Sequence, residues 1–477
     1  MKRLGLLLGP LLSACMVGPD YEKPQVEAPV NWHADLSYSQ VDGQPLYDMA
    51  WVDIFQDDDL RQLIEQALVN NRDMLIAVER IEQARANNRI VRSALYPTVD
   101  LELLGEREDE SKRTNDNPEQ VDEVFFGLSF AWEADLWGKN RRASNAAFAR
   151  YLSAEYGAQA VRLSLIAEVS GAYFQLQGSE ALLEINLDTL KAREKALDIA
   201  SKRHAGGLTS KLEVMQSEVE LAQTRAIIPV VEQNKLQFEN QLSILLGQPP
   251  SHREISARLR DQYVPASVIA GMPSTLLQRR PDVLEAEQQL RAASEGVGVA
   301  TAGLFPNVQL TGSLGYESED FDDMMDNDAE FWILNLDVVM PLFNAGARRA
   351  ELTAAESRFN QARLSYEQVV LEAFREVSDA LNGFYKAGET LQARLDLERA
   401  SAEYLSLATK RWRNGVLAYI DVLDAQRSLF EAQIGVSEAR EAQLTALVGL
   451  YKAVGGGWDP SEIAAVAESG SPKPPPE

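Results

Sequence analysis

Apolar and polar residues alternate in four segments of about ten residues, which predicts β-strands whose two faces meet different surroundings. The segments cover residues 98–106, 122–133, 307–317 and 331–341. In the second segment Phe126, Leu128 and Phe130 share one face, whereas Gly127 and Ser129 share the other. A sheet packed on a soluble core also alternates in this way. The bulk of the apolar face and the acids on the other face favour strands of a transmembrane β-barrel.

Two much longer segments carry apolar residues at steps of three and four, which predicts unusually long α-helices. They run from about Trp137 to Ala205 and from about Phe343 to Asn414, without a proline. At 1.5 Å per residue each helix spans roughly 100 Å. The spacing is that of a coiled-coil seam, although a helix in a compact bundle has the same period. A glycine turn and a shorter returning helix follow each, so we expect helical hairpins at residues 137–246 and 343–454.

The chain contains the same unit twice. Residues 70–97 align with residues 279–306, and Gly207 corresponds to Gly415. Each copy, residues 70–250 and 279–457, is predicted to hold a helix, two strands and a long hairpin, and residues 251–278 link the copies. Pro229 falls in the first returning helix, where a proline should produce a kink, and its counterpart in the second copy is Ser437.

Four strands are too few to close a membrane barrel, which needs about eight or more. An open sheet edge in lipid would leave backbone N–H and C=O groups without partners. Several chains must therefore contribute strands to one barrel. The connections within the two strand pairs, residues 106–120 and 318–330, are strongly polar and suit the cell exterior.

The amino terminus predicts export and lipidation. Lys2 and Arg3 precede a short apolar run, and "LSAC" ends at Cys15, the single cysteine. Residues 1–14 have the features of a signal peptide, and the sequence up to Cys15 resembles a bacterial lipobox, in which the cysteine is acylated. An ordinary signal peptide followed by an incidental thiol is the alternative. Met16 follows, which favours sorting to the outer membrane, and residues 15–69 would form a lipidated segment and an equatorial region.

Charge and composition weigh against other classes of protein. A net charge of −26 argues against a nucleic-acid partner, since binding phosphates requires clustered Lys and Arg. His33, His204 and His252 lie far apart, and no metal or nucleophile motif is present, so we expect neither an enzyme nor a cofactor apart from the covalent lipid. The tail, residues 458–477, has the composition of a disordered segment.

Asp421 and Asp424 lie three residues apart on one face of the helix that follows the second glycine turn. The equivalent positions of the first hairpin hold Glu213 and Gln216, so only the second copy carries the aspartate pair. Aspartates near a helix start also interact favourably with the helix dipole, although Asp421 lies about six residues past the turn, which is somewhat late for that role.

Together these features resemble the TolC-like outer membrane factors, in the lipoprotein branch that works with resistance-nodulation-division pumps. The motifs that carry the resemblance are "CMVGPDYEKP", "WVDIFQDDDLRQLIEQAL", "RRPDVLEAEQQLRAA", "PLFNAGARRAEL", "LDAQRSLFEAQ" and "LYKAVGGGW". The resemblance implies an α+β membrane protein: a homotrimer with a twelve-stranded outer-membrane barrel continuous with a helical coiled-coil tunnel in the periplasm. It also implies a periplasmic adaptor and an inner-membrane pump as partners, and export of drugs or small toxic compounds without covalent chemistry.

The resemblance assigns a periplasmic gate to the tip of the second hairpin. Three copies of Asp421 and Asp424 would form two carboxylate rings there, near Trp412, Arg413 and Tyr419. Some relatives close the tip with a tyrosine before the turn and an arginine after it, but here those places hold Trp412 and Leu417. A polar latch is therefore in doubt, and packing of Trp412 is the alternative. The expected adaptor-docking turns consist of Gly206, Gly207, Leu208, Thr209, Asn414, Gly415, Val416 and Leu417.

Three other functions share part of this pattern. An outlet for metal-ion efflux and an outlet for type I protein secretion would be built in the same way. A periplasmic coiled-coil lipoprotein that only spaces membranes would share the lipobox and the helices, but it would have no use for lipid-facing strands.

Overall fold

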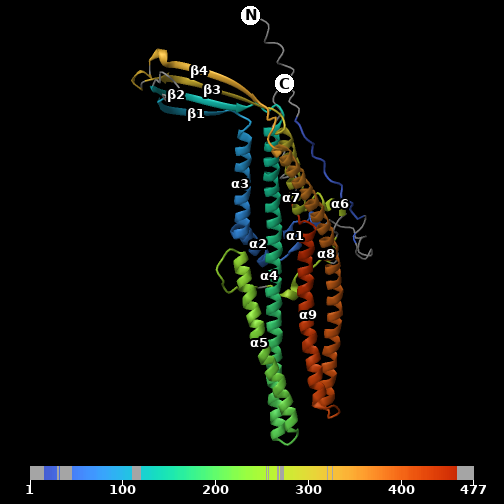
Figure 1. Ribbon diagram of the computed structural model, residues 1–477. Coiled ribbons are helices and arrows are strands. Elements are labelled where there is room, and N and C mark those ends of the chain that lie inside the picture. The colour runs from blue at the N-terminus through green and yellow to red at the C-terminus, as the bar shows by residue number, and fades with distance from the viewer. Residues whose placement is uncertain are drawn as a thin grey trace.

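The computed structural model describes residues 16–29, 32, 46–109, 120–253, 255, 257–265, 268, 273–319, 321–324 and 326–458. It shows two very long helical hairpins side by side, with a sheet at one end and the hairpin turns at the other (Figure 1). The predicted signal peptide, Cys15 and the tail beyond Trp458 lie outside the described residues.

The sheet holds all four predicted strands in the order β1-β2-β3-β4, and every neighbouring pair is antiparallel. Its strands are β1 (Thr98–Asp109), β2 (Gln120–Glu133), β3 (Asn307–Ser318) and β4 (Glu330–Val339). β1 and β2 extend further into their polar connection than predicted, whereas β4 ends two residues early, just before Pro341, which has no N–H to donate to a ladder. On the bulky face Leu101 is 68% exposed and Trp332 76% exposed, so a single subunit leaves this face uncovered.

The hairpins have equal lengths in the two repeats. α4 (Lys139–Ala205) and α8 (Ala347–Arg413) contain 67 residues each, and the returning helices α5 (Lys211–Leu245) and α9 (Tyr419–Ala453) contain 35 each. α3 (Arg72–Ser93) and α7 (Pro281–Ala302) precede the strands, with 22 residues each. Pro229 lies inside α5, which continues across it. No helix in the described ranges combines the length and the apolar character that crossing a membrane would require.

The main apolar core lies about halfway along the molecule, where short elements surround the hairpins (Figure 1). These elements are η3 (Leu46–Asp48), α1 (Trp51–Ile54), α2 (Asp58–Asn70), η4 (Leu259–Asp261) and α6 (Pro273–Leu276), while η5 (Phe321–Asp323) and η6 (Asn327–Ala329) connect β3 to β4. Asp57 caps α2 through the N–H groups of Asp59 and Leu60. The Tyr173 hydroxyl of α4 donates to the same carboxylate at 2.6 Å, which fixes α2 against the long helix.

Across the lower half of Figure 1 the helices follow the order α5, α4, α9, α8. α4 contacts α9, and this contact joins the two hairpins of the subunit. α5 and α8 lie at the outer edges, and both expose large apolar side chains. Examples are Leu212, Val219 and Leu236 on α5, and Leu364, Leu371 and Leu407 on α8.

Candidate gate at the hairpin tips

The two turns at the free end of the hairpins have the same backbone geometry. Gly207 and Gly415 adopt φ values of 71° and 73°, which a side chain would disfavour. The N–H of Leu208 bonds to the carbonyl of Arg203 at 2.9 Å, and the N–H of Val416 bonds to that of Arg411 at 3.0 Å. Such bonds satisfy carbonyls at a helix end. The predicted docking residues thus lie together at the extreme end of the molecule, and most of them are exposed.

The aspartate pair lies on the surface of α9, directly after the second turn. Asp421 belongs to the first turn of α9, and Asp424 is exposed one turn later. The hydroxyl of Tyr404 on α8 donates to Asp424 Oδ2 at 3.4 Å. Desolvation raises the pKa of Tyr404, and the carboxylates of Asp424 and Asp421 raise it further. Both acids therefore act on the same place beside α8, as the spacing of three residues predicted.

Trp412 and Tyr419 belong to a small apolar cluster inside the tip. Their rings lie 5.3 Å apart, and the guanidinium of Arg203, from the first hairpin, lies 5.0 Å above the Trp412 ring. The Ser217 hydroxyl, also from the first hairpin, contacts the Tyr419 hydroxyl at 3.4 Å. Burial raises the pKa of Tyr419. Packing, together with a cation–π contact, therefore joins the two hairpins within the subunit.

Arg413 does not take part in this contact. Its side chain is exposed, and within the described part of the subunit it forms no hydrogen bond or ion pair. Leu417, at the position where some relatives have an arginine, packs against the apolar cluster. Inside one subunit the tip thus contains no polar latch through Arg413.

A buried ion-pair network above the tip was not predicted from the sequence. Glu220 of α5 bonds Arg193 of α4 at 2.8 Å and Arg427 of α9 at 3.2 Å, so one carboxylate connects three helices. Arg193 also donates to the Glu220 carbonyl and to the Thr224 hydroxyl, both at 2.6 Å. Burial lowers the pKa of Arg193 despite the nearby carboxylate. The signal was present, since Glu220 falls at the three-and-four spacing of the buried residues Val214, Ser217, Leu221 and Thr224.

The described amino-terminal segment begins directly after Cys15 and is bound where the strands meet the long helices. The N–H of Val17 donates to the carbonyl of Trp137 at 3.1 Å. Arg142, 2% exposed, bonds Asp20 at 3.0 Å and Glu295 at 3.1 Å, which fixes the segment to α4 and α7. This brings the residue after Cys15 to the boundary between the sheet and the helices.

The family model described as "Outer membrane efflux protein" matches residues 63–248 and 272–456, one match for each repeat. Over 460 residues, 94% of each chain, the protein is 34% identical to the toluene efflux pump outer membrane protein TtgC of a solvent-exporting strain of Pseudomonas putida. It is equally similar, with the same coverage, to the antibiotic efflux pump outer membrane protein ArpC of Pseudomonas putida. The open state of the MtrE outer membrane channel of Neisseria gonorrhoeae superposes with a TM-score of 0.85 at 29% identity, over 93% of this chain and 98% of that one.

A four-stranded sheet continuous with two hairpins of roughly 100 Å defines an outer membrane channel. The chain belongs to the outer membrane efflux protein family. The predicted family, fold class, main function and outer-membrane location are thereby confirmed. The family is one of channels and not a class of enzymes.

Proposed function

We propose that three copies of the chain form the exit duct of a tripartite efflux pump. Their sheets would close one twelve-stranded barrel, above a periplasmic tunnel made of the hairpins. The observation that carries this proposal is the open sheet: in the described part of one subunit, β1 and β4 each have an edge without a neighbouring strand, and the bulky apolar face is exposed. Such edges in lipid leave backbone groups unpaired until the sheet closes. Cross-linking that yields no species larger than a monomer in membranes would contradict the trimer.

The cargo would be small toxic organic compounds or drugs, received from a periplasmic adaptor and an inner-membrane resistance-nodulation-division pump. The relatives named for toluene and antibiotic efflux favour organic cargo over metal ions or proteins. The adaptor would dock at the exposed turns around Gly207 and Gly415. Deletion of the gene should sensitise cells to organic solvents or antibiotics, and sensitisation to metal salts alone would support the metal-efflux alternative.

Lipid attached to Cys15 would anchor the chain beside the barrel. The bond from Val17 to Trp137 supports this position, because it holds the neighbouring residues where the strands meet the helices. Labelling with palmitate tests the anchor, since a Cys15→Ser variant should lose the label.

Asp421 and Asp424 would form the gate in the assembled trimer. Three copies of each would give two rings of negative charge at the tip, which repel one another and attract cations. Trp412 and Tyr419 would hold the tip closed through packing, and Arg413 remains exposed for contacts with a neighbouring subunit or the adaptor.

Single-channel conductance in planar bilayers tests the gate. Replacing Asp421 and Asp424 together by alanine should raise the conductance of the closed channel and weaken its block by divalent cations. The matched control replaces their counterparts, Glu213 and Gln216, by alanine and should leave both properties unchanged. If the aspartate double variant conducts and is blocked like the unmodified protein, these residues do not form the gate.

A further inference from the structure

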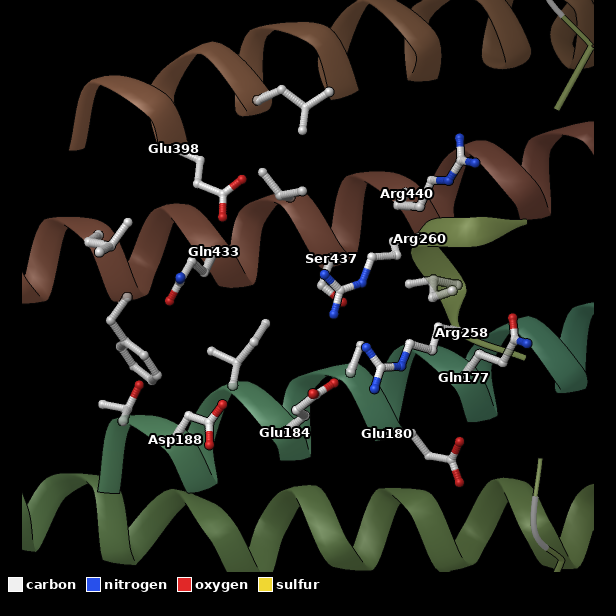
Figure 2. A pocket seen from close by; sticks show the side chains of 18 of the residues that line it. Gln177, Glu180, Glu184, Asp188, Arg258, Arg260, Glu398, Gln433, Ser437 and Arg440 are labelled. Atoms are coloured by element: carbon white, nitrogen blue, oxygen red, sulfur yellow. The ribbon is translucent and has the colours of Figure 1, made fainter. Parts of the chain in front are cut away.

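A cavity of about 950 Å³ lies between the two hairpins, away from the tip (Figure 2). α4, α8 and α9 form its walls, and residues 257–262 of the linker between the repeats, called the strap here, close one end. The strap is firmly held: the Gln177 amide donates to the Ala257 carbonyl at 3.0 Å, Arg440 donates to the Gln262 carbonyl, and Leu259 is buried in the main core. The volume lies in the range of pockets that bind drug-sized molecules.

Three buried polar atoms of the lining residues have no hydrogen-bond partner among the described residues. They are Gln177 Oε1, Ser437 Oγ and Arg440 Nε. Gln177 is 2% exposed and Ser437 8% exposed. Buried polar groups are almost always hydrogen-bonded, so three such groups at one cavity indicate a site that favours a polar occupant.

Two cationic side chains enter the cavity from the strap. Arg258 and Arg260 lie two residues apart, on either side of the buried Leu259, and both guanidinium groups point inward (Figure 2). Arg258 points toward α4 and Glu184, and Arg260 points toward α9 and Ser437. Within the described ranges neither arginine forms a hydrogen bond or an ion pair. A guanidinium offers several N–H donors in the geometry that a carboxylate or a sulfonate requires.

Most of the acids in the cavity wall are already paired. Glu180 bonds Lys235 at 3.0 Å, and Asp188 bonds Lys191 at 3.0 Å. Arg440 donates only to the neutral acceptors Gln443 and Gln262, and burial lowers its pKa. At the strap end Arg258, Arg260 and Arg440 therefore outnumber Glu184, and Glu398 of α8 lies toward the opposite end (Figure 2).

The rest of the wall is apolar and includes an aromatic ring. Its side chains are those of Ile185, Leu391, Leu395, Leu429, Phe430 and Val436. An occupant that meets both parts of the wall needs an anionic group at one end and an apolar body at the other.

We propose that this cavity binds an organic anion with an apolar body, such as an aromatic sulfonate or carboxylate. The anionic group lies at Arg258, Arg260 and Ser437, and the apolar body lies against α8, α9 and Ile185. The inference goes beyond the proposed duct and does not depend on it, because every wall of the cavity comes from a single subunit.

Two dyes that share a ring system test this assignment. 1-Anilinonaphthalene-8-sulfonate carries the sulfonate, N-phenyl-1-naphthylamine lacks it, and both fluoresce on entering an apolar site. Each is titrated into the full-length protein in lipid nanodiscs, with empty nanodiscs as the blank. Replacing Arg258 and Arg260 by glutamine should weaken binding of the sulfonate dye about tenfold or more and leave the neutral dye nearly unaffected.

A matched control removes the same charge elsewhere. Arg225 and Arg399 are exposed, lie outside the cavity wall and pair with Glu194 and Asp396. Their double glutamine variant should bind both dyes like the unmodified protein. The assignment is overturned if the Arg258 and Arg260 variant binds the sulfonate dye normally, or if the control variant loses as much affinity.

A third variant, Ile185→Phe, reduces the space for the ring system and should weaken both dyes. Unchanged binding of both dyes to it would place them outside the cavity and overturn the assignment. Single-channel conductance of all three variants reports whether the channel is intact. Loss of dye binding with normal conductance separates this site from the proposed duct.

Discussion

Glu220 provides a quantitative test of how the hairpins are held together above the tip. Its carboxylate binds Arg193, whose side chain is only 8% exposed, and Arg427, whose side chain is 48% exposed. Removing one partner of a buried ion pair costs about 3–5 kcal/mol, because the other charge stays buried and uncompensated. In a Glu220→Ala variant Arg193 keeps the residue 220 carbonyl and the Thr224 hydroxyl as acceptors. We therefore expect the lower value, about 3 kcal/mol.

The loss should appear as faster hydrogen exchange in this part of the hairpins. Local opening governs exchange of protected amides, and about 3 kcal/mol corresponds to an opening constant about 150-fold larger. The amides to follow are those between Val214 and Thr224 on α5. Arg427→Gln is the matched control: it removes the exposed partner of the same carboxylate, which is worth about 0–1 kcal/mol and at most about fivefold in exchange.

A Glu220→Ala variant whose exchange rises less than about tenfold would refute this reasoning. The same holds if Arg427→Gln accelerates exchange as much, since the two partners of Glu220 would then contribute equally despite their different burial. Amides of α3, which lies far from the network (Figure 1), should exchange at unchanged rates in both variants.

Two further predictions concern the contact between the hairpins. Burial, and then the nearby Glu438, raise the pKa of Glu441 from 4.5 to about 7, so the folded protein binds this proton more tightly than the unfolded chain; stability should fall as pH rises from about 5 to about 7 and then level off, and urea unfolding should show a flatter pH profile for Glu441→Gln. An unaltered slope in that variant would rule out Glu441 as its source. Trp412→Ala should loosen the tip by about 2 kcal/mol, because it removes the Tyr419 contact and the platform for Arg203; limited proteolysis at the turns should then be faster, Trp412→Phe should retain most of the protection, and equal cleavage of both variants would contradict the packing role.

The repeat and its elements could be predicted because each left a periodic signal in the sequence. Alternation at every second residue located the four strands, and steps of three and four located α4 and α8 over their full length. The glycines at 207 and 415 located the turns, since both adopt a positive φ. The aspartate pair was placed on the surface of α9 by its spacing, but its action as a gate stays a prediction.

Contacts between distant segments left no such signal. Arg203 meets Trp412 although the two lie on different hairpins, and periodicity within one helix says nothing about that pairing. The strap and residues 16–29 are extended segments without a repeating pattern, so their packing on the hairpins could not be predicted. Arg142, almost fully buried between α4 and α7, was overlooked because arginine is usually found on the surface.

The equal helix counts of the two hairpins restrict how the molecule can evolve. A deletion of two turns from α4 and α5 alone would raise that tip by about 10 Å, leaving the neighbouring tip of α8 and α9 protruding like an uneven stave. A partner that grips both turns at once would then find only one within reach. Changes in length are therefore expected to arise in matched sets of four, one in each of these helices, which makes gradual shortening or lengthening of the periplasmic part difficult.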